Sequence, residues 1–181
     1  TTSPNAPTED AAGVVSIYSD SYTDVAGTNF FPFWNQSTTY SEFDLSGDKM
    51  IQYSNLNYQG IELGSDVNAA IKTTLHLDIW TSNLSTLEVF LISRTGTPPD
   101  NEKKVTVSLT ANQWTTVDID LKEYTDQGLS VGDIFQFKFN DPNGSAGTIF
   151  LDNIYFYGSS GVSNPASSAS VPQQRASRVS S

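Results

Sequence analysis

The chain has 181 residues, about the length of one domain with some residues to spare. It contains no cysteine, so a disulfide framework, a thiolate metal site and a cysteine nucleophile are all excluded. Its 9 basic and 20 acidic residues give a formal net charge of −11, which argues against nucleic acid and anionic membrane surfaces as partners.

Both ends of the chain have the composition of linkers. Residues 1–12 hold two prolines among small polar residues with no hydrophobic period, and residues 159–181 are rich in serine and contain two more prolines. All aromatic residues lie between these segments. We therefore expect one folded domain at 13–158, preceded by a linker and followed by a linker or tail.

Within 13–158 nearly every periodic stretch alternates apolar and polar residues. Leu75–Trp80 places three aliphatic side chains on one face, and Phe135–Phe139 places three phenylalanines on one face. Turn-forming residues separate these stretches, and only Leu121–Gln127 has room for a helical turn. The pattern predicts an all-β fold, an antiparallel β-sandwich of the jelly-roll type, with a closed barrel as the alternative. The expected strands are 13–19, 38–45, 49–55, 59–63, 75–80, 86–93, 104–109, 117–121, 135–139 and 148–157.

The last strand contains a carboxylate, Asp152, within a run of apolar residues. Burying it is costly unless it is hydrogen-bonded, paired or bound to a cation. If the first and last strands are neighbours, the oxygen-rich segment after the first strand approaches it. Asp20, Asp24 and Asp152 are therefore candidate ligands for calcium, which prefers carboxylate and carbonyl oxygens. The alternative is that Asp152 faces outward or accepts backbone hydrogen bonds.

Aromatic residues beside amides suit a glycan, since sugar rings pack on aromatic faces and their hydroxyls need donors and acceptors. Phe30, Phe31, Phe33 and Trp34 form one dense group, in which Phe30 and Phe33 are expected to be structural, while Trp34 is a candidate for either a structural or a glycan-binding role. Trp80 is expected to face outward, because its strand places it opposite the aliphatic residues. The other candidates near these aromatics are Tyr58, Asn57, Gln59 and Asp78.

If three of the expected strands share a sheet, a single groove results. It would be lined by His76, Asp78, Trp80, Arg94, Gln136 and Lys138. Its cationic groups would suit an acidic or sulfated polysaccharide. The alternative is that these are ordinary solvated side chains on the outside of a sandwich.

Signals for catalysis are weak. Asp118 and Asp120 lie on one strand face, roughly 7 Å apart, which resembles the carboxylate pair of a glycoside hydrolase. Solvated acids on a strand have the same spacing. The single histidine excludes a multi-histidine metal centre, and no nucleophile-elbow, zinc-protease or phosphate-loop motif occurs. A small lyase or hydrolase is the weakest alternative.

Several stretches resemble accessory domains of secreted glycoside hydrolases and polysaccharide lyases from bacteria that degrade marine polysaccharides. The most specific are Val14–Val25, followed by Trp34–Ser37, and Ile149–Phe156. Tyr53–Gly60 and His76–Trp80 lie at positions where such domains have similar sequences. The resemblance covers residues 13–158.

This resemblance implies a non-catalytic carbohydrate-binding module, similar to the galactose-binding-like jelly-roll families. It implies that the module targets a polysaccharide-degrading catalytic domain of the same parent chain to its substrate, and that a structural calcium joins the first and last strands. We expect a secreted monomer that binds neither nucleic acid nor membrane. A structural or adhesive spacer is the alternative. The expected glycan-binding residues are Trp80, Tyr58, Gln59, Asn57, Asp78, His76, Lys138, Arg94 and Trp34.

Overall fold

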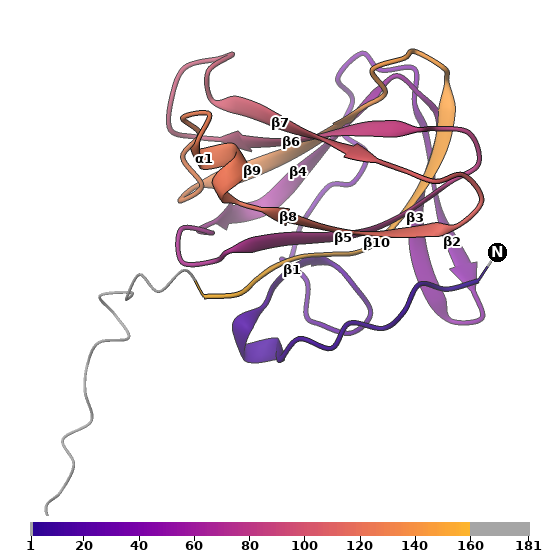
Figure 1. The fold of residues 1–181 in the computed structure, drawn as a ribbon, viewed down its shortest axis with the longest axis horizontal. Helices are drawn as coiled ribbons and strands as arrows, with labels where there is room; N and C mark the ends of the chain where they lie inside the picture. Colours follow the sequence, from indigo (N-terminus) through magenta and orange to yellow (C-terminus); the bar gives the residue numbers. More distant parts are fainter. Residues whose placement is uncertain (1, 160–181) are drawn as a thin grey trace, which may run out of the picture.

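The computed structural model describes residues 2–159, which form two stacked antiparallel sheets (Figure 1). Most of the predicted tail, 160–181, lies outside the described residues. The predicted antiparallel β-sandwich is confirmed, and the separate sheets exclude the closed barrel. Within the described chain, no helix is long and apolar enough to cross a membrane.

The larger sheet has six strands in the order β2-β3-β10-β5-β8, and β1 pairs with the other end of β10 on the β3 side. Its strands are β1 (Val15–Tyr18), β2 (Thr39–Leu45), β3 (Asp48–Leu56), β5 (Thr74–Thr81), β8 (Trp114–Asp120) and β10 (Gly147–Tyr157). The predicted pairing of the first and last strands is present, with Ser16 opposite Tyr155.

The smaller sheet has four strands in the order β4-β9-β6-β7. These strands are β4 (Tyr58–Val67), β6 (Thr86–Ser93), β7 (Glu102–Ser108) and β9 (Ile134–Asn140). A 3-10 turn, η1 (Ala11–Gly13), precedes β1, and one helical turn, α1 (Lys122–Thr125), lies inside the predicted helical segment.

The core lies between the sheets and comes from the alternation that the sequence predicts. Leu75, Leu77 and Ile79 of β5 face Phe137 and Phe139 of β9 across the sandwich, and all are fully buried. Phe135 is an exception, because the register of β9 shifts near Ile134. Ile134 takes the buried position, and Phe135 is turned outward.

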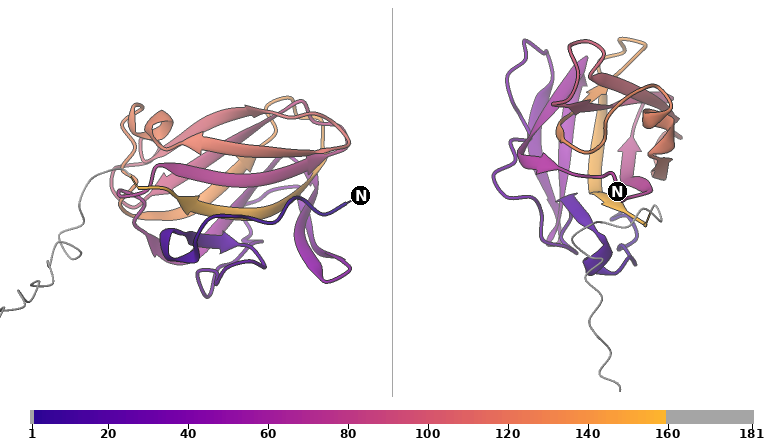
Figure 2. Two further views of the ribbon diagram at one scale, coloured as in Figure 1. Left: turned by 60° about the horizontal axis from the view of Figure 1, so that its bottom comes forward. Right: turned by 90° about the vertical axis from the view of Figure 1, so that its left-hand side faces the viewer.

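The first segment of the chain lies against the larger sheet. Residues 2–10, predicted from composition to be a linker, run along the outer face of the larger sheet, as the left view of Figure 2 shows. The hydroxyl of Tyr22 donates to the Glu9 carbonyl at 2.7 Å, and the Nε1–H of Trp114 donates to the Thr2 carbonyl. No hydrophobic period marks this segment, so its contact with the sheet could not be predicted from the residue pattern.

The loop between β1 and β2 covers the free edge of β4. Asn29 and Glu62 exchange two backbone hydrogen bonds of 2.8 and 2.9 Å, and the Thr38 hydroxyl donates to the Tyr58 carbonyl at 2.8 Å. At Gly64 the loop approaches so closely that a Cβ atom would lie 1.8 Å from the Ala26 carbonyl oxygen. The loop thus protects an edge strand and holds Trp34 in a fixed place.

Replacing Gly64 with alanine should force the loop away from β4. We expect a loss of about 1–3 kcal/mol in the free energy of unfolding, as for other overpacked sites. Chemical denaturation measures this. Gly13→Ala is the matched control, because a Cβ there meets nothing within 4 Å. Equal stability of the two variants would contradict the close approach.

Candidate functional site

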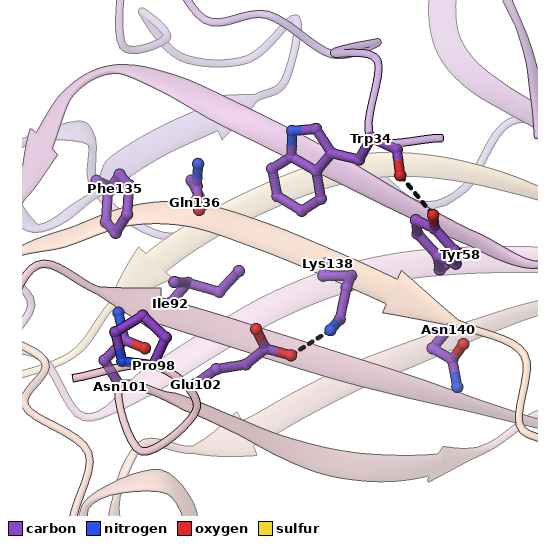
Figure 3. A pocket seen from close by; sticks show the side chains of 10 residues that line it. All are labelled: Trp34, Tyr58, Ile92, Pro98, Asn101, Glu102, Phe135, Gln136, Lys138 and Asn140. Carbon is purple, nitrogen blue, oxygen red and sulfur yellow. Dashed lines mark hydrogen bonds and ion pairs between the residues drawn. The ribbon is translucent and has the colours of Figure 1, made fainter. Parts of the chain in front are cut away.

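A cleft of about 460 Å³ crosses the outer face of the smaller sheet (Figure 3). Alternate residues of β9 form its floor, Trp34 and Tyr58 stand at one side, and the start of β7 with the preceding loop forms the other side. The volume is in the usual range for ligand sites. The lining residues are Trp34, Tyr58, Ile92, Pro98, Asn101, Glu102, Phe135, Gln136, Lys138 and Asn140.

Trp34 is held over the backbone of Gly60. A Cβ at Gly60 would lie 2.5 Å from two atoms of the indole ring, so only glycine lets the ring lie this close to the strand. The indole Nε1–H donates to Glu62 at 2.9 Å, and the Tyr58 hydroxyl donates to the Trp34 carbonyl. These contacts fix the ring and leave it half-buried at the wall of the cleft.

The charged groups near the cleft are paired with one another. Lys138 forms an ion pair with Glu102, and its ammonium lies 4.1 Å from the centroid of the Phe90 ring. Glu88 is paired with Lys104. Although burial raises the pKa of Glu88, the hydrogen bonds from Lys104 and Asn140 and the positive charges of Lys104 and Lys138 together lower it by more, so its net pKa is lowered. Lys138 and Glu102 are the only charged residues that line the cleft within residues 2–159.

Two amides on the floor offer hydrogen-bonding capacity. Gln136 makes no side-chain hydrogen bond with any described residue, so its donors and its acceptor are available. The Nδ2 of Asn140 donates to Glu88, and its side-chain carbonyl oxygen is available to accept a hydrogen bond. Between them lies Lys138, so donors and acceptors alternate along β9 beside an aromatic wall.

Three of the predicted glycan-binding residues come together here: Trp34, Tyr58 and Lys138. Both a structural and a glycan-binding role were open for Trp34, and it both covers Gly60 and lines the cleft. The residues that the sequence argument missed are Ile92, Pro98, Asn101, Glu102, Phe135 and Asn140. Most of them come from strand and loop positions far apart in sequence, and the outward alternation of β9 was the one signal for Asn140.

Two predicted residues beside Tyr58 have other roles. Gln59 is 0% exposed, donates to the Gly60 carbonyl at 2.9 Å and accepts from Gln36, because strand alternation turns it away from Tyr58. Asn57 is a turn residue whose side-chain oxygen accepts from the Ser37 and Tyr58 amides at 3.0 and 2.7 Å. Neither lines the cleft.

The predicted single groove from His76 to Lys138 does not form. His76, Asp78 and Trp80 lie on β5 of the larger sheet, while Lys138 lies on β9 of the smaller sheet, so the two groups are on opposite outer faces. Arg94 follows β6, bonds Asp66 at 2.7 Å and lies 4.4 Å over the Phe135 ring. The strands were correct, but their assignment to one sheet was wrong.

The other aromatic residues of the Trp34 loop divide between packing and solvent. Phe30 packs against the core, and Phe31 stacks on Tyr40 at 5.5 Å. Phe33, predicted to be structural, is 80% exposed, so that expectation was wrong. Phe33 does not line the cleft.

On the outer face of the larger sheet, His76 is enclosed by acids. Its Nδ1 lies 2.8 Å from Asp118, its Nε2 lies 3.2 Å from Asp78, and its ring stacks on Tyr155 at 4.6 Å. Burial lowers the pKa of His76, but the hydrogen bonds with Asp78 and Asp118 and the negative charges of these two acids together raise it by more, so the net pKa is raised. The cluster favours the imidazolium form.

The carboxylate pair considered for hydrolysis is engaged in local contacts. Asp118 accepts from Tyr157 at 3.0 Å and contacts His76, and Asp120 accepts from the Lys122 amide at 2.9 Å. Neither residue lines the 460 Å³ cleft. Asp118 and Asp120 therefore make local hydrogen bonds outside the cleft, which favours a structural role for both.

Asp152 is 1% exposed and lies beneath the first segment of the chain. Its carboxylate accepts from the Asn153 amide at 2.8 Å, where a β-bulge gives Asn153 a φ of 49°. It lines a cavity of about 230 Å³ with Asp20, Asp48 and residues 3–7 except Asn5. Burial, followed by the negative charges of Asp48, Asp20 and Asp78, raises the pKa of Asp152 to about 8.

The predicted calcium ligands do not all meet at this cavity. Asp24 accepts from the Ser16 hydroxyl at 2.6 Å and the Ser19 amide at 3.0 Å, and it does not line the cavity. Asp48, which the sequence argument did not include, takes its place beside Asp20 and Asp152. In residues 2–159, no three acidic or histidine side chains are gathered in a ready metal-binding arrangement.

No protein-family model matches the sequence, and no curated protein matches it. Solved structures of carbohydrate-binding modules do match in fold. A family 29 module matches with a TM-score of 0.53 and 11% identity, over 79% of this chain and 86% of that chain. A family 11 module of a cellulosomal cellulase from Clostridium thermocellum matches with a TM-score of 0.58 and 13% identity, over 81% and 95%.

Another family 11 structure from Clostridium thermocellum contains a β-1,3-1,4-mixed-linked tetrasaccharide and matches with a TM-score of 0.57 and 16% identity, over 81% and 96%. At these identities the likeness establishes the fold that the chain shares with carbohydrate-binding modules.

His76 makes the stability of the domain depend on pH. Because its folded-state pKa is raised above the ordinary value, its stabilisation is complete below about pH 6.5 and is lost as the pH rises through the folded-state pKa. His76→Gln should therefore cost roughly 1–3 kcal/mol more at pH 5.5 than at pH 9. Thermal melts of both proteins at the two pH values measure this. A constant difference would show that His76 is not charged in the folded protein.

Proposed function

We propose that this chain is a non-catalytic module that binds a neutral polysaccharide in the cleft of the smaller sheet. The observation that carries the proposal is the fixed Trp34 wall beside the open amide of Gln136. An indole face packs against sugar C–H groups, and the amides, Glu102 and Lys138 can bond hydroxyls. The shared fold supports this, since one structural neighbour is in complex with a β-1,3-1,4-mixed-linked tetrasaccharide and another with cellulohexaose.

The pairing of charges favours a neutral glycan over the acidic polysaccharide considered from sequence. Lys138 is neutralised by Glu102, and Glu62 beside the indole adds a negative charge. An acidic or sulfated sugar would have to displace Glu102 from Lys138 and approach a protein of net charge −11.

We propose that the module is part of a secreted enzyme that degrades polysaccharide, as its resemblance to accessory domains of marine bacterial enzymes implies. Binding to the glycan would keep a catalytic domain of the same chain at high local concentration near its substrate. The module acts as a monomer in this proposal, with its cleft complete within one chain.

Trp34→Ala should weaken binding at least roughly tenfold, because the loss of a central aromatic anchor commonly costs 2 kcal/mol or so. Gln136→Ala should weaken it about fivefold, the cost of a net hydrogen bond. Titration calorimetry with cellohexaose and with a soluble mixed-linked β-1,3-1,4-glucan measures both. Phe33→Ala is the control, since Phe33 lies on the same loop but outside the cleft.

Two results would contradict the cleft as a glycan site. One is wild-type affinity in a folded Trp34→Ala protein. The other is no binding of the wild type to any neutral glucan or mannan, which would favour the structural spacer.

We also propose that calcium occupies the cavity of Asp20, Asp48 and Asp152. Three carboxylates line this cavity without a lysine or arginine among the lining residues, and one of them is almost fully buried. Calcium would offset their repulsion and bind carboxylate and backbone oxygens there. The side chains would draw together around the ion, because no three are now in a metal-binding arrangement within the described chain.

Removing calcium should make stability fall as the pH rises. The folded-state pKa of Asp152 is about 8, far above its unfolded value, so the folded state binds more protons between about pH 4 and pH 8. In a chelator, the melting temperature should fall across this window, and calcium should restore it at pH 8. Asp152→Asn should abolish both effects. Equal melting temperatures at pH 8 with calcium and with chelator would exclude the ion.

A further inference from the structure

The outer face of the larger sheet, opposite the cleft, carries a row of aromatic side chains. Phe150 of β10 is paired with Trp80 of β5, and Trp80 is paired with Trp114 of β8. Phe43 of β2 extends the row, with ring centroids 5.7 Å apart for Phe43 and Phe150, and 5.5 Å apart for Phe150 and Trp80. From β2 to β8 the row crosses five strands, a span on the order of 20 Å.

A hollow of about 640 Å³ lies at the tryptophan end of this row. Its walls are Trp80 and Trp114 together with three polar residues, Asn112, Gln113 and Thr116, and residues 2–5. None of the lining residues is charged, in a protein whose net charge is −11. Indoles bordered by amides and hydroxyls, without charge, are suited to the C–H faces and hydroxyls of a neutral sugar.

The first segment of the chain covers this hollow. We name residues 2–8 the arm. With the rest of the described chain the arm makes a single hydrogen bond, from the Nε1–H of Trp114 to the Thr2 carbonyl. Pro4 lines the hollow and is half-buried, and its saturated ring offers C–H groups to the site as a pyranose ring would. A cover held by so few polar contacts is easily displaced.

We propose that the face around Trp80 and Trp114 is a second binding surface for a neutral glycan chain, and that the arm occupies it as an intramolecular competitor. The arm lowers the apparent affinity of this face, because only the fraction of molecules with the arm displaced can bind. The two surfaces lie on opposite sheets, so one molecule can contact two glycan chains or two segments of one chain.

A glycan fits this face better than an apolar protein partner does. The hollow keeps polar groups on its floor and rim, and Asn112 and Gln113 are exposed beside the tryptophans. A purely apolar partner would leave these amides without hydrogen bonds, at a cost for each. Sugar hydroxyls would satisfy them while the rings pack on the indoles.

The three tryptophans allow both surfaces to be observed in one experiment. Trp34 lies in the cleft, and Trp80 and Trp114 lie in the hollow, with no other tryptophan in the chain. The full chain labelled with 5-fluorotryptophan gives three fluorine NMR signals, assigned by Trp34→Phe, Trp80→Phe and Trp114→Phe. The probes are cellohexaose, the mixed-linked glucan, a β-1,3-glucan and a mannan.

In the full chain, the Trp80 and Trp114 signals should shift with a neutral glycan at concentrations above those that shift the Trp34 signal. Deletion of residues 1–7 should lower the apparent Kd reported by Trp80 and Trp114 by roughly threefold or more, and leave the Trp34 titration unchanged. Trp114→Phe should act in the same direction as the deletion, because it removes the hydrogen bond to the arm and retains an aromatic ring.

Each outcome separates the two proposals. If the Trp34 signal moves while the Trp80 and Trp114 signals stay fixed in both the full and the shortened chain, the second surface is overturned and the row only packs against the arm. If Trp80 and Trp114 respond but Trp34 does not, the second surface stands and the cleft proposal fails. If no probe moves any signal, both are overturned.

Discussion

The larger sheet of this protein depends on how its central strand, β10, accommodates two buried polar residues, Asp152 and Asn153. β10 pairs with β3 and β1 along one side and with β5 along the other, so the larger sheet is built around it. At Asp152 and Asn153 its register shifts, and Asn153 then donates to Asp78 and accepts from Ser19, both at 2.8 Å. The bulge joins β10 to β5 and to the residue that follows β1 through side chains, and the burial of Asp152 beside it raises the pKa of its carboxyl group.

The outer faces of the two sheets carry different side chains. On the smaller sheet a loop covers the edge and supplies Trp34, and the charges are paired around an open amide. On the larger sheet the acids gather around His76 at one end, while the uncharged aromatic row lies at the other. The same sandwich thus separates a polar, charge-balanced face from one that is partly acidic and partly aromatic.

Local alternation was enough to predict the strands and the sandwich, since each side chain's direction follows from its neighbours along the strand. It also indicated that Trp80 faces outward and that Lys138 accompanies Gln136. It could not assign β5 and β9 to opposite sheets, because strand order depends on contacts distant in sequence. Phe135 was misplaced by a register shift, and Asp48 and Glu102 were missed because turns bring them to their cavities. The contact of residues 2–10 with the larger sheet could not be predicted, because an extended segment can lie on a sheet face without any hydrophobic periodicity.

The loop from β1 to β2 supplies Trp34 and also blocks the backbone of β4, and this double role constrains how the protein can change. β4 is an edge strand of the smaller sheet. An uncovered edge strand can pair with a strand of another chain and so promote aggregation. If the cleft binds a glycan as proposed, substitutions that reshape the Trp34 wall to suit another sugar would also loosen this cover. Ligand preference and resistance to aggregation would then be coupled, so new specificity would arise more safely at the opposite wall, around Pro98 and Asn101.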